Sequence, residues 1–255
     1  VACPAHTIDM VSVPAHPDHG KPDTTLSDRV VLDIEGNQRM VLDADQQAAD
    51  PLGRIVVRYH TNILGARIRQ ESMEAGQRWT LTDIVGNPLR AWDSRGHAHV
   101  RQYDRLRRPI GVTVHGATLD SDPRTLGRTI LVERTDYGDT HSAAMPDDFS
   151  PEKFNLRGRI YQHWDSSGCV TNAQVDADRG PIAAYDFKGN VLRTTRWLAA
   201  DYKGIPDWAA TPSPVVEDEY FESRMWYDAV NRLHQTLAPH SNLGRATINV
   251  TQNRY

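Results

Sequence analysis

The chain has 255 residues, a formal net charge of −4 and 39% hydrophobic residues. The acidic balance gives no basic field that would attract nucleic acid, and no stretch approaches the ~18 apolar residues of a membrane-spanning helix. Two cysteines, Cys3 and Cys169, exclude a disulfide scaffold and a four-cysteine zinc site. Whether they pair stays open, and two free thiols are the favoured interpretation.

Residues 1–28 form a proline-rich N-terminal segment with Pro4, Pro14, Pro17 and Pro22. Proline fixes φ and removes a ladder donor, so this segment is predicted to be extended. Its cluster His16-Pro-Asp-His19 has two interpretations, a metal site or a polar turn. The polar turn is favoured, because no further ligand stands at a metal-site spacing.

Residues 29–115 contain the clearest repeats, of which Trp92-Asp93-Ser-Arg-Gly96 is typical. Asp favours the first position of a tight turn because its carboxylate accepts nearby backbone N–H groups. Gly three positions later suits the left-handed residue that closes a type I turn with a bulge. Each repeat therefore predicts one β-hairpin. His97 and His99 alternate, which leaves a chelating pair open beside the favoured interpretation of two polar strand residues.

Residues 116–153 interrupt the repeats. A strand is predicted over 129–134, followed by a loop insertion near 135–153. Carboxylate pairs can perform acid–base chemistry or bind Ca²⁺, but the spacing here fits neither a calcium loop nor a glycosidase pattern. A solvated acidic loop is favoured. Its carboxylates are Asp136, Asp139, Asp147 and Asp148.

Residues 154–204 form the second repeat tract, with Trp164-Asp165-Ser-Ser-Gly168 and Tyr185-Asp186-Phe-Lys-Gly189 as its clearest copies. A proline-rich connection is predicted over 205–219, and a last repeat follows in 220–255. No segment shows a clear amphipathic period, and residues 196–202 are the only weak helix candidate.

Two repeats, Tyr103-Asp104 and Tyr227-Asp228, place Arg107 and Asn231 where Gly stands elsewhere. Asp50 with Gly53 and Asp201 with Gly204 also have the spacing. Nine of the 17 glycines lie three residues after one of 35 Asp and Asn, where chance would give about two (17 × 35/255). From Asp83 to Asp104 and from Asn155 to Asp186 the spacing is 10 or 11 residues, and Asp186 to Asp228 is 42 residues, about four such steps. Strands at such spacing indicate an all-β array.

The repeated Tyr-Asp-x-x-Gly-Asn/Arg pattern resembles the YD repeats of RHS proteins. That family includes the B and C components of bacterial Tc insecticidal toxins, polymorphic contact-dependent toxins and the teneurins. Asn155-Leu-Arg-Gly-Arg-Ile-Tyr161, Tyr185-Asp-Phe-Lys-Gly-Asn190 and Pro206-Asp-Trp208 are similar to the RHS part of Tc B-like proteins. The resemblance covers roughly residues 29–255. It implies repeated antiparallel hairpins in a curved, spiralling β-sheet that is a segment of a hollow shell.

The function that the resemblance implies is structural. The chain would help to encapsulate and deliver a toxin, secreted or at the cell surface as part of a toxin complex. The implied partners are flanking RHS repeats of a larger polypeptide and an encapsulated toxin domain, with no cofactor. Because no catalytic motif is visible and the family's self-cleaving aspartyl site is not found, no enzyme activity is expected. A carbohydrate- or protein-binding β-repeat module on a cell surface stays open as the alternative.

The residues expected to matter are therefore turn residues and the aromatics beside them, without catalytic or metal-binding residues. The aromatics are expected to share one face. The isolated chain is expected to be an open sheet without a closed core, which self-associates or is only marginally stable. The predicted turn residues are Asp33, Gly36, Asn62, Gly65, Asp83, Gly86, Asp93, Gly96, Asp104, Asn155, Gly158, Asp165, Gly168, Asp186, Gly189 and Asp228. The predicted repeat aromatics are Trp92, Tyr103, Phe154, Trp164, Tyr185 and Tyr227.

Overall fold

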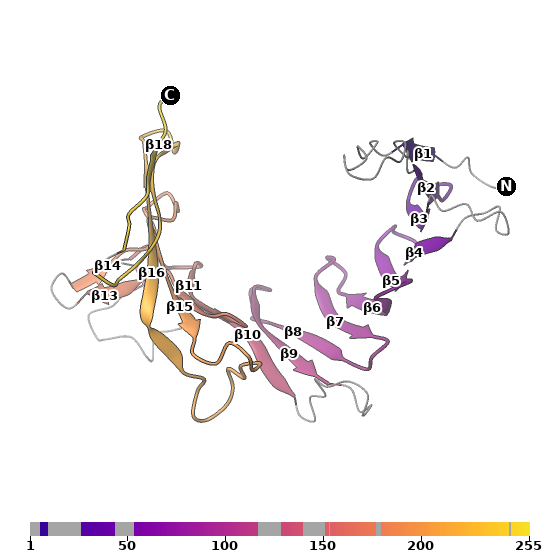
Figure 1. Ribbon diagram of the computed structural model, residues 1–255, viewed down its shortest axis with the longest axis horizontal. Helices are drawn as coiled ribbons and strands as arrows, with labels where there is room; N and C mark the ends of the chain where they lie inside the picture. Colours follow the sequence, from indigo (N-terminus) through magenta and orange to yellow (C-terminus); the bar gives the residue numbers. More distant parts are fainter. Residues whose placement is uncertain are drawn as a thin grey trace, which may run out of the picture. The chain divides into compact units, whose positions relative to one another are not determined.

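The computed structural model describes residues 6–9, 27–43, 54–116, 129–139, 151–152, 154–176, 180–244 and 246–255. Regular structure in these ranges consists of strands, which confirms the predicted all-β fold (Figure 1). Within the same ranges, no helix is long and apolar enough to cross a bilayer. The His16–His19 cluster, the Asp50–Gly53 turn, Cys3, Asp147 and Asp148 lie outside the described residues.

Sixteen strands follow one another in sequence order in one open sheet, and two more form a separate hairpin. The strand pairs are antiparallel, as the hairpin repeats predict. The chain divides into two compact units. The first includes Val1–Val100, and the second includes Arg101–His115 and Leu126–Tyr255.

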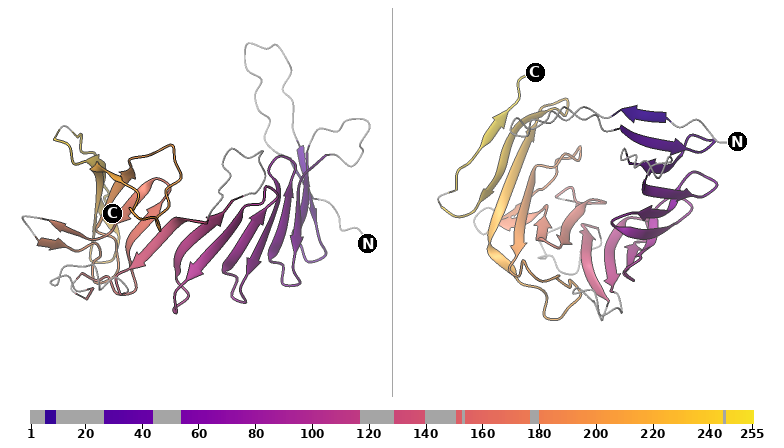
Figure 2. Two further views of the ribbon diagram at one scale, coloured as in Figure 1. Left: turned by 90° about the horizontal axis from the view of Figure 1, so that it is seen from below. Right: turned by 45° about the vertical axis from the view of Figure 1, so that its right-hand side comes forward.

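The first unit is a ribbon of hairpins in which each strand pairs with the one before it. Figure 2 shows these strands, indigo to magenta, side by side. Leu42 is the one described hydrophobic residue that is buried here up to Val100. The strands are β1 (His6–Asp9), β2 (Ser27–Leu32), β3 (Gln38–Leu42), β4 (Ile55–Thr61), β5 (Arg67–Ser72), β6 (Gly76–Thr82), β7 (Pro88–Asp93) and β8 (Ala98–Tyr103), whose last residues belong to the second unit.

The second unit continues the hairpins but also folds segments back onto the sheet. Its strands are β9 (Pro109–His115), β10 (Ile130–Tyr137), β11 (Ile160–Asp165), β12 (Gly168–Thr171), β13 (Gln174–Asp176), β14 (Gly180–Ile182), β15 (Arg193–Ala199), β16 (Val216–Tyr227), β17 (Leu233–Ser241) and β18 (Val250–Gln252). The hairpin β13–β14 stands outside the main sheet.

A hydrophobic core lies in the second unit, contrary to the expected sheet without a core. Its buried residues come from the segment before β11 and from both sides of the β13–β14 hairpin. They are Phe154, Leu156, Ala173, Ala184 and Tyr185, and Tyr161, Ala183 and Val191 pack against them.

Three local expectations are corrected by the strands. β10 extends to Tyr137, and β16 begins at Val216, so the ends of the expected loop and of the expected connection are strand. The weak helix candidate at 196–202 begins inside β15, where Arg196 pairs with Phe221. Trp197, Thr194 and Thr195 in this strand are β-branched or aromatic, so strand propensity and pairing decide the structure there.

Candidate functional site

Among the described residues, seven turns close through the same loop. In one of them, the Asp93 N–H donates to the His97 carbonyl (3.1 Å) and the Gly96 N–H donates to the Asp93 carbonyl (3.2 Å). Gly96 has a φ of 85°, in the left-handed region that glycine adopts without a steric penalty. The same two backbone bonds form in the turns headed by Asp33, Asn62, Asp83, Asp93, Asp104, Asp186 and Asp228.

The side chain of the leading residue makes a second set of bonds. Asp93 Oδ1 accepts the backbone N–H groups of Arg95 (3.0 Å) and His97 (2.9 Å), and Oδ2 lies 3.0 Å from His97 Nδ1. In six of the seven turns, a side-chain donor four residues on reaches Oδ2. These donors are Asn37, Asn87, His97, Arg108, Asn190 and Arg232.

This donor explains the last position of the repeat. The motif Asp-x-x-Gly is followed by Asn, His or Arg because the second carboxylate oxygen needs a partner inside the turn. Sequence reasoning noted the Asn or Arg in the pattern but gave it no role. The signal was a polar residue recurring four positions after the aspartate.

The donors keep the turn carboxylates ionised. Burial raises the pKa of Asp93, but the backbone and ring of His97 outweigh it, so that pKa lies below the ordinary 3.8. The backbone N–H of Arg232 is the main reason why the pKa of Asp228 is lowered. The pKa is lowered in the same way, against burial, for Asp33, Asp104 and Asp186.

Two turns hold a left-handed residue without using glycine. Arg107 and Asn231 stand at the glycine position with φ of 62° and 67°. Asn tolerates this region readily, whereas Arg does so rarely. The loop therefore forces the backbone geometry even where the side chain disfavours it.

The Asp165 turn differs from the common loop. Asp165 pairs directly with Gly168 across a two-residue connection that contains Ser167. Asp165 Oδ1 accepts the Ser167 N–H (2.7 Å), and both carboxylate oxygens accept from Arg196 Nη2. Gly168 has a φ of 132°, and a Cβ there would lie 2.1 Å from the Trp197 carbonyl oxygen. Glycine is required by the close approach of β15 as well as by the turn.

Asn155 does not head a repeat turn, which corrects the sequence prediction. Asn155 itself has a φ of 55°, and its Nδ2 donates to the Tyr185 carbonyl (3.0 Å). The turn is instead closed by the Arg159 N–H on the Leu156 carbonyl (3.0 Å), with Gly158 at φ 69°. The one-residue shift accompanies the complete burial of Leu156 in the core.

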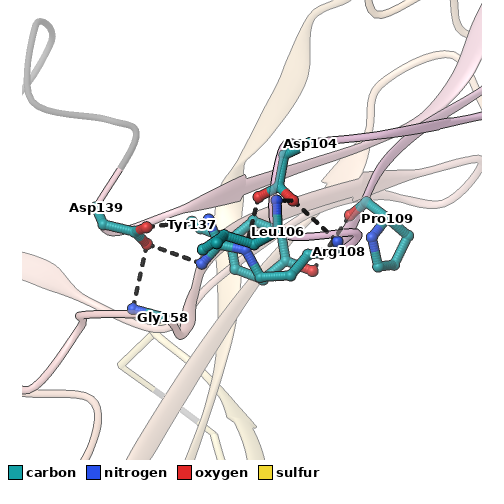
Figure 3. A network of polar contacts seen from close by, with 7 residues as sticks. All are labelled: Asp104, Leu106, Arg108, Pro109, Tyr137, Asp139 and Gly158. Carbon is teal, nitrogen blue, oxygen red and sulfur yellow. Dashed lines mark hydrogen bonds and ion pairs between the residues drawn. The ribbon is translucent and has the colours of Figure 1, made fainter.

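Arg108 joins the Asp104 turn to the end of β10 (Figure 3). Its Nε donates to Asp104 Oδ2 (2.6 Å), and its Nη1 and Nη2 donate to the two oxygens of Asp139 (3.0 Å each). Its guanidinium lies 4.1 Å from the centre of the Tyr137 ring. Asp139 Oδ1 also accepts the Gly158 N–H (3.2 Å). Such a bidentate pair is strong and geometrically specific.

This junction changes the interpretation of the acidic segment. Arg108 lowers the pKa of Asp139 and has its own pKa raised by that carboxylate. Asp136 is bound by Arg134 Nε (3.1 Å) and Nη2 (2.7 Å). Two of the four carboxylates expected in a solvated loop are therefore paired with arginines.

The Pro206-Asp-Trp208 motif anchors the connection between β15 and β16. Asp207 Oδ1 accepts the Leu131 N–H (3.0 Å), and the Trp208 N–H donates to the Leu131 carbonyl (2.9 Å). The Trp208 ring is buried, and its Nε1 donates to the Asp165 carbonyl (3.1 Å). The connection is thus fixed to β10 and β11 rather than passing over them.

Comparisons with known proteins support the predicted resemblance. No family model matches the chain. Toxin subunit YenC1 of Yersinia entomophaga is 25% identical over 142 residues, which are 55% of this chain and 13% of that relative. The crystal structures of TcdB2-TccC3 and TcdB2-TccC3-Cdc42 match with a TM-score of 0.60 at 19% identity, over 91% of this chain and 11% of theirs. The resemblance to Tc toxin proteins is confirmed.

A structure of the Photorhabdus luminescens Tc holotoxin pore gives the same result, with a TM-score of 0.61 and 19% identity. It is matched over 92% of this chain and 11% of its own. The chain therefore has the fold of part of a Tc toxin and spans only about a ninth to an eighth of these proteins.

The predicted repeat aromatics lie in different surroundings. Trp92 pairs with Trp79 in the first unit, and Trp164 pairs with Cys169 in the second. Tyr185 lies in the buried core, together with the predicted Phe154. Tyr103 and Tyr227 end β8 and β16, directly before their turns.

Guanidinium groups pack against three of these rings, which sequence reasoning missed. Arg134 lies 4.7 Å from the centre of the Trp164 ring, and the corresponding distances are 5.5 Å for Arg90 and Trp92 and 5.2 Å for Arg159 and Tyr185. Each contact is worth roughly 0.5–1 kcal/mol at an exposed site. Arginine side chains thus cover aromatic faces in both units.

Among the described residues, no group of three or more His, Cys, Asp or Glu could hold a metal. His97 belongs to the Asp93 turn rather than to a strand, because β8 begins at Ala98. Cys169 is buried, and burial raises the pKa of its thiol to about 12. That thiol is therefore unreactive at neutral pH.

Proposed function

We propose that this chain is a structural segment of an RHS-repeat shell that encapsulates and helps deliver a secreted toxin. The observation that carries the proposal is the repeated turn, whose carboxylate, backbone and fourth residue are bonded to one another. A loop that saturates its own polar groups can be repeated along a ribbon of any length. The shared fold with Tc toxin structures supports the same role.

The chemistry of the turns also supports a role without catalysis. A general acid or base needs a pKa near the working pH and access to a substrate. The pKa values of Asp93 and Asp186 are lowered, and their oxygens accept bonds from within the turn. Arg108 and Asp139 are likewise occupied by each other.

The shell proposal is tested on the polypeptide that carries this segment with its natural flanking sequence. A closed shell protects an enclosed domain from protease, so the cargo should survive a digestion that cuts exposed loops. Arg108→Ala breaks the junction in Figure 3 and should admit protease to the cargo. Arg157→Ala is the matched control, because Arg157 forms an exposed ion pair with Glu152 in the same unit.

Equal digestion of the cargo in the wild type and in a shell-deleted variant would refute encapsulation. Protection that is lost in Arg108→Ala and kept in Arg157→Ala would support it. Melting curves of both variants show whether lost protection reflects local opening or global unfolding.

A second candidate function is carbohydrate binding, favoured by the cross-strand pair Trp79–Trp92 on one face of the first unit. Arg69 and Arg90 each lie 5.5 Å from the centre of one of these rings, so a sugar would have to use the remaining surface. Glycan-array binding that is lost in both Trp92→Ala and Trp164→Ala would favour this function over the shell.

A further inference from the structure

A largely buried ion cluster joins β15 to β16 in the second unit. Arg193 and Arg224 stand opposite each other in the β15–β16 ladder, and Glu222 lies two residues before Arg224, on the same face. Arg193 Nη2 donates to Glu222 Oε2, and Arg224 Nε donates to Glu222 Oε1. Arg193 and Glu222 are only 8% and 5% exposed. A single carboxylate therefore serves two guanidinium groups.

Two donors of Arg193 have no acceptor within the described part of the chain. Its Nε and Nη1 are both buried, and neither has a hydrogen-bond partner there. Buried polar groups are almost always hydrogen-bonded, and a buried donor left unpaired is more costly than a formed hydrogen bond is favourable. The cluster therefore needs an acceptor other than these residues.

The charges of the cluster indicate the kind of acceptor. A guanidinium is always charged in a protein, so two arginines and one carboxylate leave one positive charge. Within the described residues, the ion pairs of both arginines go to Glu222. The ladder neighbours of Glu222 are Thr195 on β15 and His240 on β17, and neither is an anion. Water or a carbonyl would satisfy the donors, but only an anion would also compensate the charge.

The surroundings of the cluster favour a small anion. The Arg193 N–H donates to the Ala184 carbonyl (3.4 Å), and Ala184 lies fully buried in the core. The Arg224 side chain is 39% exposed, so the cluster reaches solvent on the β16 side. A monovalent ion such as chloride matches both the single positive charge and this enclosure.

We propose that Arg193 binds a chloride-like anion, which is the second negative charge of the cluster and stabilises the pairing of β15 with β16. Because Nε and Nη1 face different edges of the planar guanidinium, the anion takes one of them and water the other. The proposal is independent of the shell function, since it concerns the stability of this chain itself.

The test is a titration of chloride against gluconate at constant ionic strength, with the unfolding equilibrium measured in urea at each point. Chloride at about ten times its dissociation constant should lower the unfolding constant about tenfold, and the effect should saturate. General effects of a salt on the protein surface do not saturate in this way.

Three variants distinguish a binding site from a structural ion pair. Arg193→Met removes the charged group and keeps an aliphatic side chain, so the chloride effect should disappear. Arg196→Met is the matched control and should keep the effect, because Arg196 lies on the opposite face of the same strand and pairs with Asp165. Glu222→Gln removes a repelling charge, so chloride should bind at least about threefold tighter. A merely structural Glu222 would change stability without changing the chloride affinity.

Crystals grown in bromide give a readout that needs no variant. An anomalous peak is expected within hydrogen-bond distance of Arg193 Nε or Nη1. A peak without a saturable chloride effect would be an adventitious ion only and would overturn the proposal. Equal chloride effects in the wild type and Arg193→Met would mean that water alone meets the donors. A chloride effect that is absent from the longer polypeptide would assign the site to a carboxylate of the flanking sequence and would also overturn the proposal.

Discussion

The two units are built from the same hairpin repeat but are held together differently. In the first, the described strands up to Val100 bury one hydrophobic residue, Leu42, and the turns bond internally. In the second, Leu156 and Tyr185 lie in a core made by segments that fold back onto the sheet. A turn that bonds its own polar groups can therefore sustain a ribbon, while most of the buried hydrophobic residues lie in the second unit.

This contrast has an energetic consequence. Regions with few buried apolar contacts and exposed backbone ladders open at low free energy, often independently of a packed core. We therefore expect the first unit to open before the second. The following experiments test that order, from the largest expected effect to the smallest.

Acid should produce the largest difference, because it acts on all turn carboxylates together. The folded-state pKa values of Asp33 and Asp93 are lowered, so these groups stabilise the fold above their ordinary value of 3.8 and lose that contribution as the pH falls through the folded pKa. Below about pH 4, the first unit should lose amide protection while the second keeps it. Hydrogen exchange with mass spectrometry, corrected for intrinsic exchange rates, measures this. Simultaneous loss in both units would contradict the contrast.

Removing core volume should affect the second unit selectively. Leu156→Ala truncates a fully buried side chain and should lower the free energy of unfolding by about 2–5 kcal/mol. Leu81→Ala is the control in the first unit, where the half-exposed side chain should contribute about 0.5 kcal/mol or less. Urea denaturation of both variants gives the comparison, and equal losses would mean that the core is not the source of the difference.

Valine substitutions at two equivalent turn glycines distinguish the cost of backbone strain from the cost of a steric clash. Gly189 and Gly36 have φ of 99° and 86°. A Cβ at Gly189 would lie 2.0 Å from Arg159 Nη2, whereas nothing lies within 4 Å of one at Gly36. Gly189→Val should cost about 2–3 kcal/mol and Gly36→Val about 1–2 kcal/mol. Thermal melting shows whether Gly189→Val lowers stability more than Gly36→Val. Equal losses of stability would mean that the positive φ alone, and not the contact with Arg159, causes the destabilisation.

The sequence predicts the local part of this structure and misses the distant part. Asp93 and Gly96 lie three residues apart, so their turn can be inferred from residue chemistry alone. The role of His97 as a side-chain donor could also have been predicted, because a polar residue recurs four positions after other leading aspartates. By contrast, Leu156 and Tyr185 meet in the core although they lie far apart in the sequence. No repeated pattern in the residues between them predicts that contact.

The same limit applies to Trp208, which anchors the connection between β15 and β16, and to the exposed aliphatic residues of the turns. Trp208 reaches Asp165 over 43 residues, and no pattern within either segment reports the other. Ile34 and Ile84 look like ordinary strand residues in a sequence window, because aliphatic residues favour strands. Their exposure follows only from the exact placement of the turn, one residue after the leading Asp.

The smallest expected effect is the replacement of one carboxylate by an amide. Asn62 heads a turn with the same backbone bonds, and its Oδ1 accepts the N–H groups of Leu64 and Ala66 (2.9 Å each). Asp93→Asn should therefore keep the Oδ1 bonds and lose only the charge opposite His97. The free energy of unfolding at neutral pH should fall by about 0.5 kcal/mol or less.

The same variant should lose part of its acid sensitivity, since an amide does not protonate in this range. Urea midpoints at neutral pH and below about pH 4 measure both effects on one protein. Asp93→Ala, which removes the acceptor altogether, should cost about 1 kcal/mol at neutral pH because two backbone donors lose their partner, and less below about pH 4, where the wild type has itself lost part of the contribution of this carboxylate. If Asn proved as costly as Ala, the charge rather than the hydrogen-bond geometry would hold the turn, and the neutral Asn62 turn would have to be stabilised by its neighbours in the ribbon.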